Sequence, residues 1–521
     1  MTVKKFHKSR GASPLKSAIK SIIMGNYTGP LSKTKPLAQK MNGLGDGIAF
    51  TNCRVFDGWQ AELQEDMVIL VSRDRILDVG HKGQMTVPSS FAMIDVEGRT
   101  IMPGLIDSHV HMCSPFTYRV NRAALRQMPK QIVLNYRLTA HSGVTTVCDM
   151  GGPPGFIKEF TQLADRNDIA GPRQLNSFTL ISPRKGKNLG YPSQVKIFNP
   201  FQSWLMEGQA ATRPNTLEDL KKTCYKVKDD GGTHLKTTCQ SHPFSRKKYS
   251  TQDEFPVFSD DWLKAIFAIG KETGLPVDIH APYANDAERC VDLAIKTGAR
   301  IRIQHMAFDR HLNDLFIQKV RDYGFSIIPT VMVFGDSFSM PSFVSWLDTA
   351  NPNISMLPEP IRQAKSLIQN GIDLERLSGQ VVMDHDYAYF RDNFDFVRSN
   401  TQRAHGHGII GFGTDIGGTY TGFFGRICSE IMHYIESGVS GLDIVRYMTS
   451  VNAKINDLHD RGFVRPGMLA DLILVDGNPV ENPLILKEVP MVMKGGVFLK
   501  HAGTQLSSFY ADGRWVLHKS G

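Results

Sequence analysis

The sequence predicts an α/β protein: a (β/α)₈ barrel with a small β-sandwich domain that is built from both ends of the chain. Eight apolar, strand-like runs between residues 101 and 414 alternate with stretches of helical spacing, which is the pattern of a parallel sheet. Eight repeats over roughly 350 residues favour a closed barrel with insertions. No Gly-x-Gly-x-x-Gly motif follows an early strand, which disfavours an open doubly wound sheet.

The elements follow one another in a regular order. The predicted strands are 101–111, 145–150, 174–181, 234–238, 276–280, 300–305, 326–333 and 409–414. The predicted helices are 120–141, 156–167, 217–228, 260–273, 284–297 and 313–323. Insertions at 182–213, 239–259 and 334–403 follow strands three, four and seven, so we expect them on the face where barrel enzymes keep their active sites.

Strand-like runs also occur outside the barrel, at 48–55, 67–79, 471–475 and 489–500. The strands from one end of the chain alone are too few to form a stable sheet. We therefore expect a composite β-sandwich domain from 47–102 and 463–505, a catalytic barrel over 103–462 and a C-terminal extension over 506–521.

Residues 1–46 are expected to form a basic, flexible tail. The first forty residues contain no Asp or Glu, and they contribute to a net charge of +9. Such a tail is typically solvated, although contact with nucleic acid or anionic lipid is the alternative. The rest of the composition, 41% hydrophobic and 21% charged, is ordinary for a soluble globular enzyme, and we expect no nucleic-acid or membrane partner.

The seven cysteines form no Cys-x-x-Cys pair, which indicates reduced thiols rather than a disulfide framework. No run of ~20 apolar residues predicts a transmembrane helix, and the segment 18–24 is too short and too polar for a secretory signal. The expected location is the cytoplasm.

Polar residues end several of the predicted barrel strands. His109 and His111 close the first strand, and alternate residues of a strand point to the same side, so two imidazoles can chelate one metal. His280, His305 and Asp415 end strands five, six and eight. A single residue of this kind is readily a satisfied buried polar group, but five at the ends of four strands favour a metal site. Imidazole and carboxylate ligands suit Zn²⁺ or a similar first-row metal.

Lys236 lies inside the fourth strand, where a charged amine is costly unless it is paired or neutralised. One interpretation is a strand-end lysine that reaches water. The other is an N6-carboxylysine formed with CO₂, which would be a carboxylate-like ligand between two cations.

Several motifs together resemble the amidohydrolase superfamily, in particular its imidazolonepropionase-related branch with ochratoxinase-like and Xaa-Pro dipeptidase-like enzymes. The resemblance covers about residues 47–500. It is carried by MPGLIDSHVH (102–111), HSGVTTVCD (141–149), LK (235–236), DIHA (278–281), IQH (303–305), GTD (413–415) and the segment 462–483.

The resemblance implies a binuclear metal centre that uses two divalent ions, by default Zn²⁺. His109, His111, Lys236 and Asp415 would hold the more buried ion, and carboxylated Lys236, His280 and His305 would hold the more exposed one. A metal-activated hydroxide would attack an amide-type C–N bond, and Asp415 would be the catalytic base and then acid.

The loops after strands three and four depart from the family's pattern, which leaves the substrate open. Arg184 and Lys185 are candidates for binding a substrate carboxylate, or they are solvated surface charges. Tyr283 and His242 are candidate substrate contacts, and Phe334, Phe338, Phe343 and Trp346 would suit an apolar group.

We expect a small-molecule substrate: an N-acyl amino acid, a dipeptide or a xenobiotic amide. The alternatives are a mononuclear deaminase, a carbamate or urea hydrolase of the same superfamily, or a non-catalytic scaffold. The DIHAPY segment lacks the His-x-x-Glu of a proton shuttle, which counts against the deaminase. A homo-oligomer is expected by analogy with the family.

Overall fold

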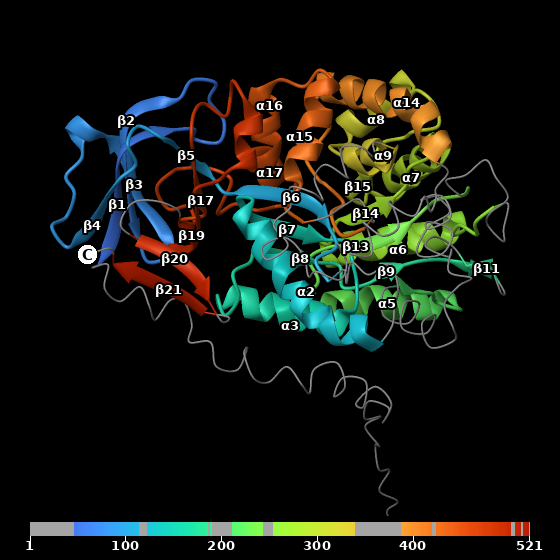
Figure 1. The fold of residues 1–521 in the computed structure, drawn as a ribbon. Coiled ribbons are helices and arrows are strands. Elements are labelled where there is room, and N and C mark those ends of the chain that lie inside the picture. The colour runs from blue at the N-terminus through green and yellow to red at the C-terminus, as the bar shows by residue number, and fades with distance from the viewer. Residues whose placement is uncertain are drawn as a thin grey trace, which may run out of the picture.

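The computed structural model describes residues 46–113, 122–185, 188–189, 211–242, 254–338, 387–418, 424–501, 506–511 and 514–519. The expected basic tail, apart from Asp46, lies outside these residues. The described residues form a TIM-barrel-like α/β part and a β-rich part. In Figure 1, strands from the N-terminal (blue) and C-terminal (red) ends lie together on the left, beside the barrel-like part on the right.

The β-rich part contains an eight-stranded sheet with the order β19-β18-β17-β5-β1-β2-β3, and β4 also pairs with β1. Its strands are β1 (Gly47–Val55), β2 (Gln64–Ser72), β3 (Arg75–His81), β4 (Phe91–Asp95), β5 (Thr100–Pro103), β17 (Leu472–Val475), β18 (Met491–Lys494) and β19 (Val497–His501). The antiparallel pairing of β17 with β5 joins the two ends of the chain within one sheet.

The sheet branches at β1. The first half of β1 pairs in parallel with β4, and its second half pairs in parallel with β5. Irregular register between Phe50 and Val55 allows the change of neighbour, because a bulge bends the strand. Phe50, Ile69 and Leu472 are among the buried side chains that form the core of this part.

The barrel-like part consists of parallel strands. They are β6 (Leu105–Val110), β7 (Val144–Asp149), β8 (Arg173–Asn176), β9 (Leu180–Ile181), β12 (Ala211–Thr212), β13 (Leu235–Thr238), β14 (Val277–His280), β15 (Ile301–Gln304) and β16 (Ser326–Ile328). They form two sheets, β6-β7-β8 and β12-β9-β13-β14-β15-β16.

Additional backbone contacts connect the edges of these two sheets. The amide of Thr233, just before β13, donates to the carbonyl of Asn176 in β8 at 2.9 Å. The eighth predicted strand appears as an extended segment in which Ile410 bridges to β16 and Ile416 bridges to β6. The first and last strand-like segments of this part therefore lie side by side.

Three predicted barrel strands are divided or shortened in the structure. The run 101–111 divides at Gly104 into β5, which belongs to the β-rich sheet, and β6. The run 174–181 divides into β8 and β9, because Phe178 adopts a left-handed backbone (φ 59°). The run 326–333 ends at Ile328, after which Pro329 precedes helix α9. The buried carboxylate of Glu430 accepts the amides of Val331 and Met332 at 2.8 and 2.6 Å and so satisfies two of the otherwise unpaired donors at the start of α9.

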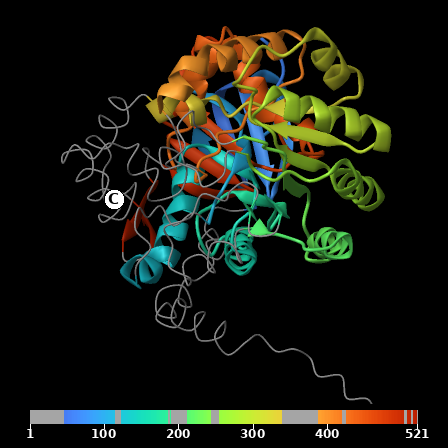
Figure 2. The ribbon, with the colours of Figure 1, turned by 90° about the vertical axis from the view of Figure 1, so that its right-hand side faces the viewer.

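Helices alternate with the strands and lie outside them (Figure 2). They are α2 (Arg122–His141), α3 (Pro154–Asp165), α5 (Leu217–Asp229), α6 (Asp260–Thr273), α7 (Ala284–Thr297), α8 (Asp314–Asp322), α9 (Val331–Phe338), α14 (Tyr387–Gly406), α15 (Ile427–Glu436), α16 (Gly441–Arg446) and α17 (Asn452–Ile455). Their ends follow local chemistry: Thr216 caps α5 by accepting the amide of Asp219, and Gly274 ends α6 in the left-handed conformation.

Short elements complete the described chain. A 3₁₀ helix, η3 (Lys82–Gln84), follows β3; a π-helical turn, η4 (Tyr447–Val451), joins α16 to α17; and a second 3₁₀ helix, η5 (Pro483–Lys487), follows β17. Strands β10 (Arg184–Lys185) and β11 (Asn188–Leu189) form a hairpin after β9. The C-terminal extension contains the hairpin of β20 (Leu506–Ala511) with β21 (Arg514–Lys519).

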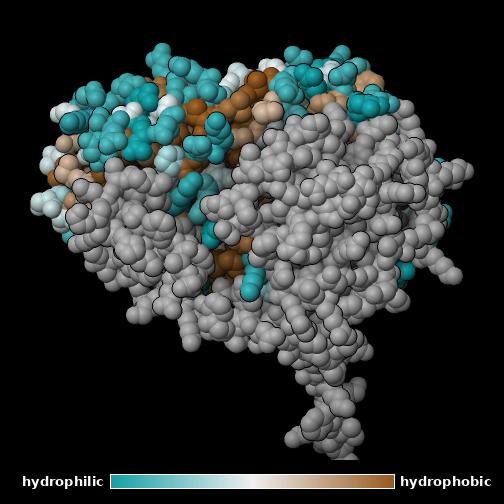
Figure 3. All heavy atoms as spheres, in the orientation of Figure 1, coloured by the Kyte–Doolittle hydropathy of each residue, from teal (hydrophilic) through white to brown (hydrophobic). Residues whose placement is uncertain are grey.

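The described surface is mostly hydrophilic in the view of Figure 3, and apolar residues gather in a band between the β-rich part and the barrel-like part. All seven cysteines are free thiols, and six of them are buried. None of the helices in the described ranges has the length and apolar character needed to cross a membrane.

A buried lysine joins the two parts. Lys494 of β18 donates to the carbonyls of Ala164 and Gly171, at the end of α3 and in the following loop, at 2.7 and 2.8 Å. Its side chain is almost fully buried. Burial and the nearby Arg173 lower the pKa of Lys494 to about 7, against the opposing charge of Asp471.

We predict that this lysine makes stability depend on pH between about 7 and 10.5. The unfolded chain keeps a Lys494 pKa near 10.5 and binds more protons in this window, so the stability of the folded state rises with pH. The rise in Tm of the metal-free protein from pH 7 to pH 9.5 should be smaller in Lys494→Met than in the wild type. The exposed Lys222→Met variant is the control and should behave as the wild type; equal rises in all three proteins would contradict the prediction.

Candidate metal centre

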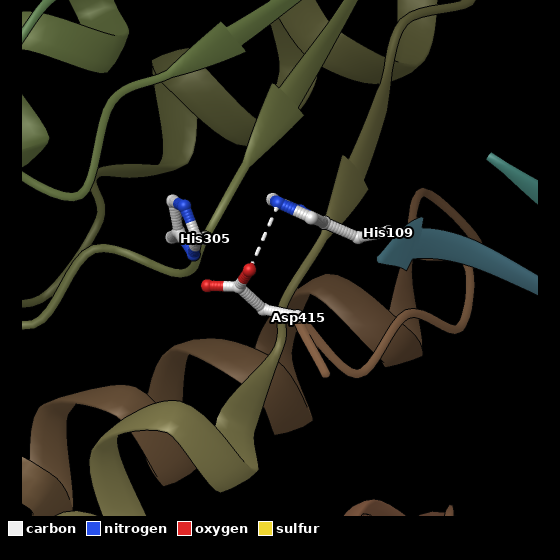
Figure 4. A group of neighbouring side chains, drawn as sticks. All are labelled: His109, His305 and Asp415. Atoms are coloured by element: carbon white, nitrogen blue, oxygen red, sulfur yellow. Dashed lines mark ion pairs between the residues drawn. The ribbon is translucent and has the colours of Figure 1, made fainter. Parts of the chain in front are cut away.

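Three buried side chains from different strands meet at one point. His109 of β6, His305 at the end of β15 and Asp415 of the eighth strand-like segment offer ligand atoms that all lie within 4.8 Å of one another. Figure 4 shows the two imidazoles and the carboxylate turned toward each other. The carboxyl ends of parallel strands meet at one edge, which explains the convergence of residues far apart in the sequence.

Two further predicted histidines join this group. His111 Nε2 lies 3.3 Å from Asp415 Oδ1, and His109 Nε2 lies 3.4 Å from the same oxygen. The ring of His280 lies 4.4 Å from that of His305, centroid to centroid, and the rings of His305 and His109 are 4.9 Å apart. The four predicted histidines and Asp415 therefore form one continuous cluster.

Lys236 belongs to the same environment. Its side chain is only 3% exposed, and its Nζ has no hydrogen-bond partner in the part of the chain that the structure describes. Burial lowers the pKa of Lys236 to about 8, although the carboxylates of Asp278 and Asp415 act in the opposite direction. An amine near this pKa is partly neutral at physiological pH, and a neutral amine is the form that can react with CO₂.

Each imidazole has one nitrogen held by an oxygen outside the cluster. The pairs are His109 Nδ1 with Gln304 Oε1 at 2.7 Å, His111 Nδ1 with the Gly151 carbonyl at 2.8 Å, His280 Nε2 with Gln240 Oε1 at 2.6 Å, and His305 Nδ1 with Thr330 Oγ1 at 2.7 Å. An outer partner of this kind fixes the orientation of a metal-ligating histidine.

The protonation of His109 and His111 follows from these contacts. In both rings Nδ1 faces an oxygen and so carries the proton, and Nε2 presents a lone pair toward Asp415 Oδ1. That carboxylate oxygen is buried and has no hydrogen-bond partner among the described residues. Three electron-rich atoms thus face one another without a hydrogen between them, an arrangement that a cation satisfies.

Burial keeps three of the four imidazoles neutral. It lowers the pKa of His109 and His280 well below 6.5 and that of His305 to about 3. For His111 burial also acts downward, but the neighbouring carboxylate of Asp415 outweighs it and raises the pKa. Metal binding requires neutral imidazole, so the donor set fits a divalent cation.

The backbone is strained where it presents these side chains. His305, Thr330 and Asp415 have φ angles of 76°, 48° and 53°, in the left-handed region that non-glycine residues rarely adopt. Strain of this kind clusters at functional sites. Glycine allows the eighth segment to approach β6: a Cβ on Gly413 would lie 2.9 Å from His109 Cβ and 2.4 Å from Ile328 Cγ2.

Several residues of the site are not among those that the sequence predicted. Gln304 stands in the IQH motif directly before His305, and Gln240 in the loop after β13. Asp107 accepts the amides of His109 and Thr414, both at 3.1 Å, and so joins β6 to the eighth segment. Gln304 directly precedes a predicted ligand, and Asp107 stands two residues before another. These positions are the sequence signals that could have identified the two residues.

The predicted substrate contacts divide into two groups. Arg184 and Lys185 are exposed on the β10–β11 hairpin, and no hydrogen bond or ion pair between these described residues and the histidine cluster is present. Tyr283 is buried, with ring centroids 4.9 Å from Phe308 and 5.7 Å from His242. Tyr283 and His242 therefore lie side by side, in the loops that follow β14 and β13.

Comparison with known proteins relates the chain to hydrolases. Residues 100–499 match the model of the amidohydrolase family. A dihydroorotase of Pediococcus pentosaceus is 22% identical over 461 residues, which are 86% of this chain and 93% of that protein.

Solved structures share the fold. A Xaa-Pro dipeptidase with methionine bound in its active site is 20% identical and has a TM-score of 0.65, over 87% of this chain and 99% of that one. The ochratoxinase of A. niger is 17% identical with a TM-score of 0.62, over 88% and 97% of the two chains. Molinate hydrolase is 16% identical with a TM-score of 0.64, over 87% and 95%. Both kinds of enzyme named by the sequence resemblance are thus among the structural neighbours.

We predict that Gly413→Ala disturbs the site through packing alone. The added methyl group has no room against Ile328 and His109, and overpacking of this kind costs about 1–3 kcal/mol. Chemical denaturation of the metal-free protein should show the loss, and zinc affinity should fall with it. Gly155→Ala in α3 is the control, because its Cβ meets open space; equal stability of the two variants would refute the packing argument.

Proposed function

Because the chain belongs to the amidohydrolase family and is therefore a hydrolase of C–N bonds, we propose that it is a binuclear metal-dependent amidohydrolase that cleaves an amide-type bond of a small molecule. The observation that supports this most is the meeting of His109 Nε2, His111 Nε2 and Asp415 Oδ1 with no hydrogen between them. The unpartnered Nζ of Lys236 is the second buried polar group that a metal centre would satisfy.

The proposed scaffold is a closed (β/α)₈ barrel over residues 103–462. Parallel pairing within each sheet, the contact of Thr233 with Asn176 and the bridges of Ile410 and Ile416 support closure. Residues 47–102 and 463–505 would form the composite β domain, with a basic tail over 1–46 and an extension over 506–521.

In this proposal His109, His111, Lys236 and Asp415 would hold one cation, and Lys236, His280 and His305 would hold the other. Lys236 would contribute to both as N6-carboxylysine. Its neutral amine forms an N–C bond to CO₂ and releases one proton, which converts a buried cation into an anionic ligand. Zn²⁺ suits a set of imidazoles and carboxylates.

Divalent cations held by these residues would lower the pKa of a water from ~15.7 toward ~7 and polarise the scissile carbonyl. Asp415 would take the proton of the attacking water, a role supported by the approach of its Oδ1 to both His109 and His111. The same carboxyl group can then deliver this proton to the departing nitrogen.

An apolar wall beside the centre supports a substrate with an apolar group. The ring of Phe334 lies edge-on to His305 at 6.4 Å, and Phe308 and Phe390 pack against Phe334 at 5.5 and 5.7 Å. We propose an N-acyl amino acid, a dipeptide or a xenobiotic amide. Arg184, Lys185, Tyr283 and His242 remain proposed substrate contacts; Phe343 and Trp346, and the side chain of Phe338, lie outside the described part.

Localisation in the cytoplasm and assembly into a homo-oligomer are parts of this proposal that rest on composition and on analogy with the family.

The proposed activity is tested by a hydrolysis screen. Zinc-loaded protein should hydrolyse members of a panel of N-acyl amino acids, dipeptides, carbamates and ureas, with chelation abolishing the activity and zinc restoring it. Cleavage confined to ureas or carbamates would replace the amide assignment. Turnover that persists after complete metal removal would contradict the metal-dependent mechanism.

We predict that Lys236→Ala binds one cation fewer per chain than the wild type and loses more than about 100-fold in kcat/KM, beyond the usual effect of losing an outer partner of a ligand. Metal content after dialysis and steady-state kinetics measure the two effects. Lys494→Met is the matched control, because it removes another buried lysine, in β18 of the β-rich sheet. This variant should keep both cations. Full activity of Lys236→Ala would exclude a bridging role.

A further inference from the structure

Two buried glutamines contact two different histidines of the centre in the same way. Gln304 Oε1 lies 2.7 Å from His109 Nδ1, and Gln240 Oε1 lies 2.6 Å from His280 Nε2. The side chains of both glutamines are at most 1% exposed. An amide can present either oxygen or nitrogen to a neighbour, so the group on the far side of each amide decides which atom faces the imidazole.

For Gln304 the deciding group is Asp278. The Gln304 amide nitrogen donates to Asp278 Oδ1, and Arg302 binds both oxygens of the same carboxylate, with Nε at 2.8 Å from Oδ1. Because the Arg302 guanidinium donates to both oxygens of this carboxylate, Asp278 is an acceptor toward Gln304. Gln304 must therefore direct its nitrogen to Asp278 and its oxygen to His109.

For Gln240 the deciding group is a backbone carbonyl. The Gln240 amide nitrogen donates to the carbonyl of His242 at 2.7 Å, and a carbonyl can only accept. The amide oxygen of Gln240 must then face His280, so His280 Nε2 carries the ring proton. By the same reasoning His109 carries its proton on Nδ1.

We infer that Gln304 and Gln240 are positioning residues, one for each cation, that fix the tautomers of His109 and His280 so that Nε2 of the first and Nδ1 of the second can bind metal. This inference rests on the proposed binuclear function. One series of hydrogen bonds runs from Arg302 through Asp278 and Gln304 to His109. The other runs from the His242 carbonyl through Gln240 to His280.

A neutral amide has a further consequence for the chemistry. A carboxylate partner would place a negative charge behind the imidazole and make it a stronger donor. Glutamine fixes the ring without that charge, so more of the cation's positive charge is left to act on water and on the substrate carbonyl.

The test is zinc affinity, measured by competition with a chromophoric chelator, for Gln304→Met and Gln240→Met. Methionine keeps the length of the side chain and removes both hydrogen bonds. In each variant the affinity for one of the two zinc ions should fall by about 10–100-fold. In the double variant the affinity for both ions should fall. Gln174→Met is the matched control: Gln174 is a buried, hydrogen-bonded glutamine of β8 that donates to Asn176, and both zinc ions should keep wild-type affinity.

Gln240→Glu separates positioning of the imidazole from support of the loop. Glutamate keeps an oxygen toward His280 and loses the donor to the His242 carbonyl, so zinc affinity should be retained if Gln240 acts on the ring. Equal loss in Gln240→Glu and Gln240→Met would overturn the inference for this residue. Gln240 lies in a loop, so its variants test the inference even where Gln304→Met does not fold.

The outcomes distinguish the two levels of the argument. Wild-type zinc affinity in folded Gln304→Met and Gln240→Met would overturn the inference and leave the proposed function intact. Failure of the wild-type protein to bind two zinc ions would overturn the proposed function, and the inference with it.

Discussion

The candidate site depends on a backbone scaffold that holds buried polar atoms in place although these have no hydrogen-bond partner among the described residues. An unsatisfied buried acceptor or donor costs about 1–3 kcal/mol, and both Asp415 Oδ1 and Lys236 Nζ are buried without a hydrogen-bond partner. A core would normally avoid such atoms. They are tolerated here because the parallel strands of the two sheets, joined by backbone hydrogen bonds and covered by helices, hold the ends of the strands in place independently of the side chains.

The meeting of the first and last segments is the point where this rigidity matters most. The Asp415 amide donates to the carbonyl of His109 at 2.7 Å, and Asp107 accepts from Thr414 through both its backbone amide and its hydroxyl. Burial raises the pKa of Asp107 to about 7, against these hydrogen bonds. The carboxyl group thus ties the backbone of His109 to that of Thr414, the residue before Asp415.

Much of the fold was predictable because periodicity and strand-end chemistry are local signals. Helices α6 and α7 begin and end where the sequence predicted, and the predicted histidines, Lys236 and Asp415 come together. The division at Phe178 and the start of α9 depend on a left-handed residue and on Glu430, 99 residues from Val331, which no local pattern reveals. Charge is the basis on which Arg184 and Lys185 are predicted to contact the substrate, and charge alone does not determine where a loop points.

The roles of Gln304 and Gln240 show why a site is harder to predict than its ligands. A ligand is recognised by residue type and by its place at a strand end. A positioning amide is recognised only when the group on its far side is known, and Asp278 is an acceptor only because Arg302, on the neighbouring strand, neutralises it. The two residues stand opposite each other in the register of β14 and β15. The tautomer of His109 is therefore set by the pairing of two strands to which His109 does not belong, a property of the assembled barrel-like part and not of any segment of the chain.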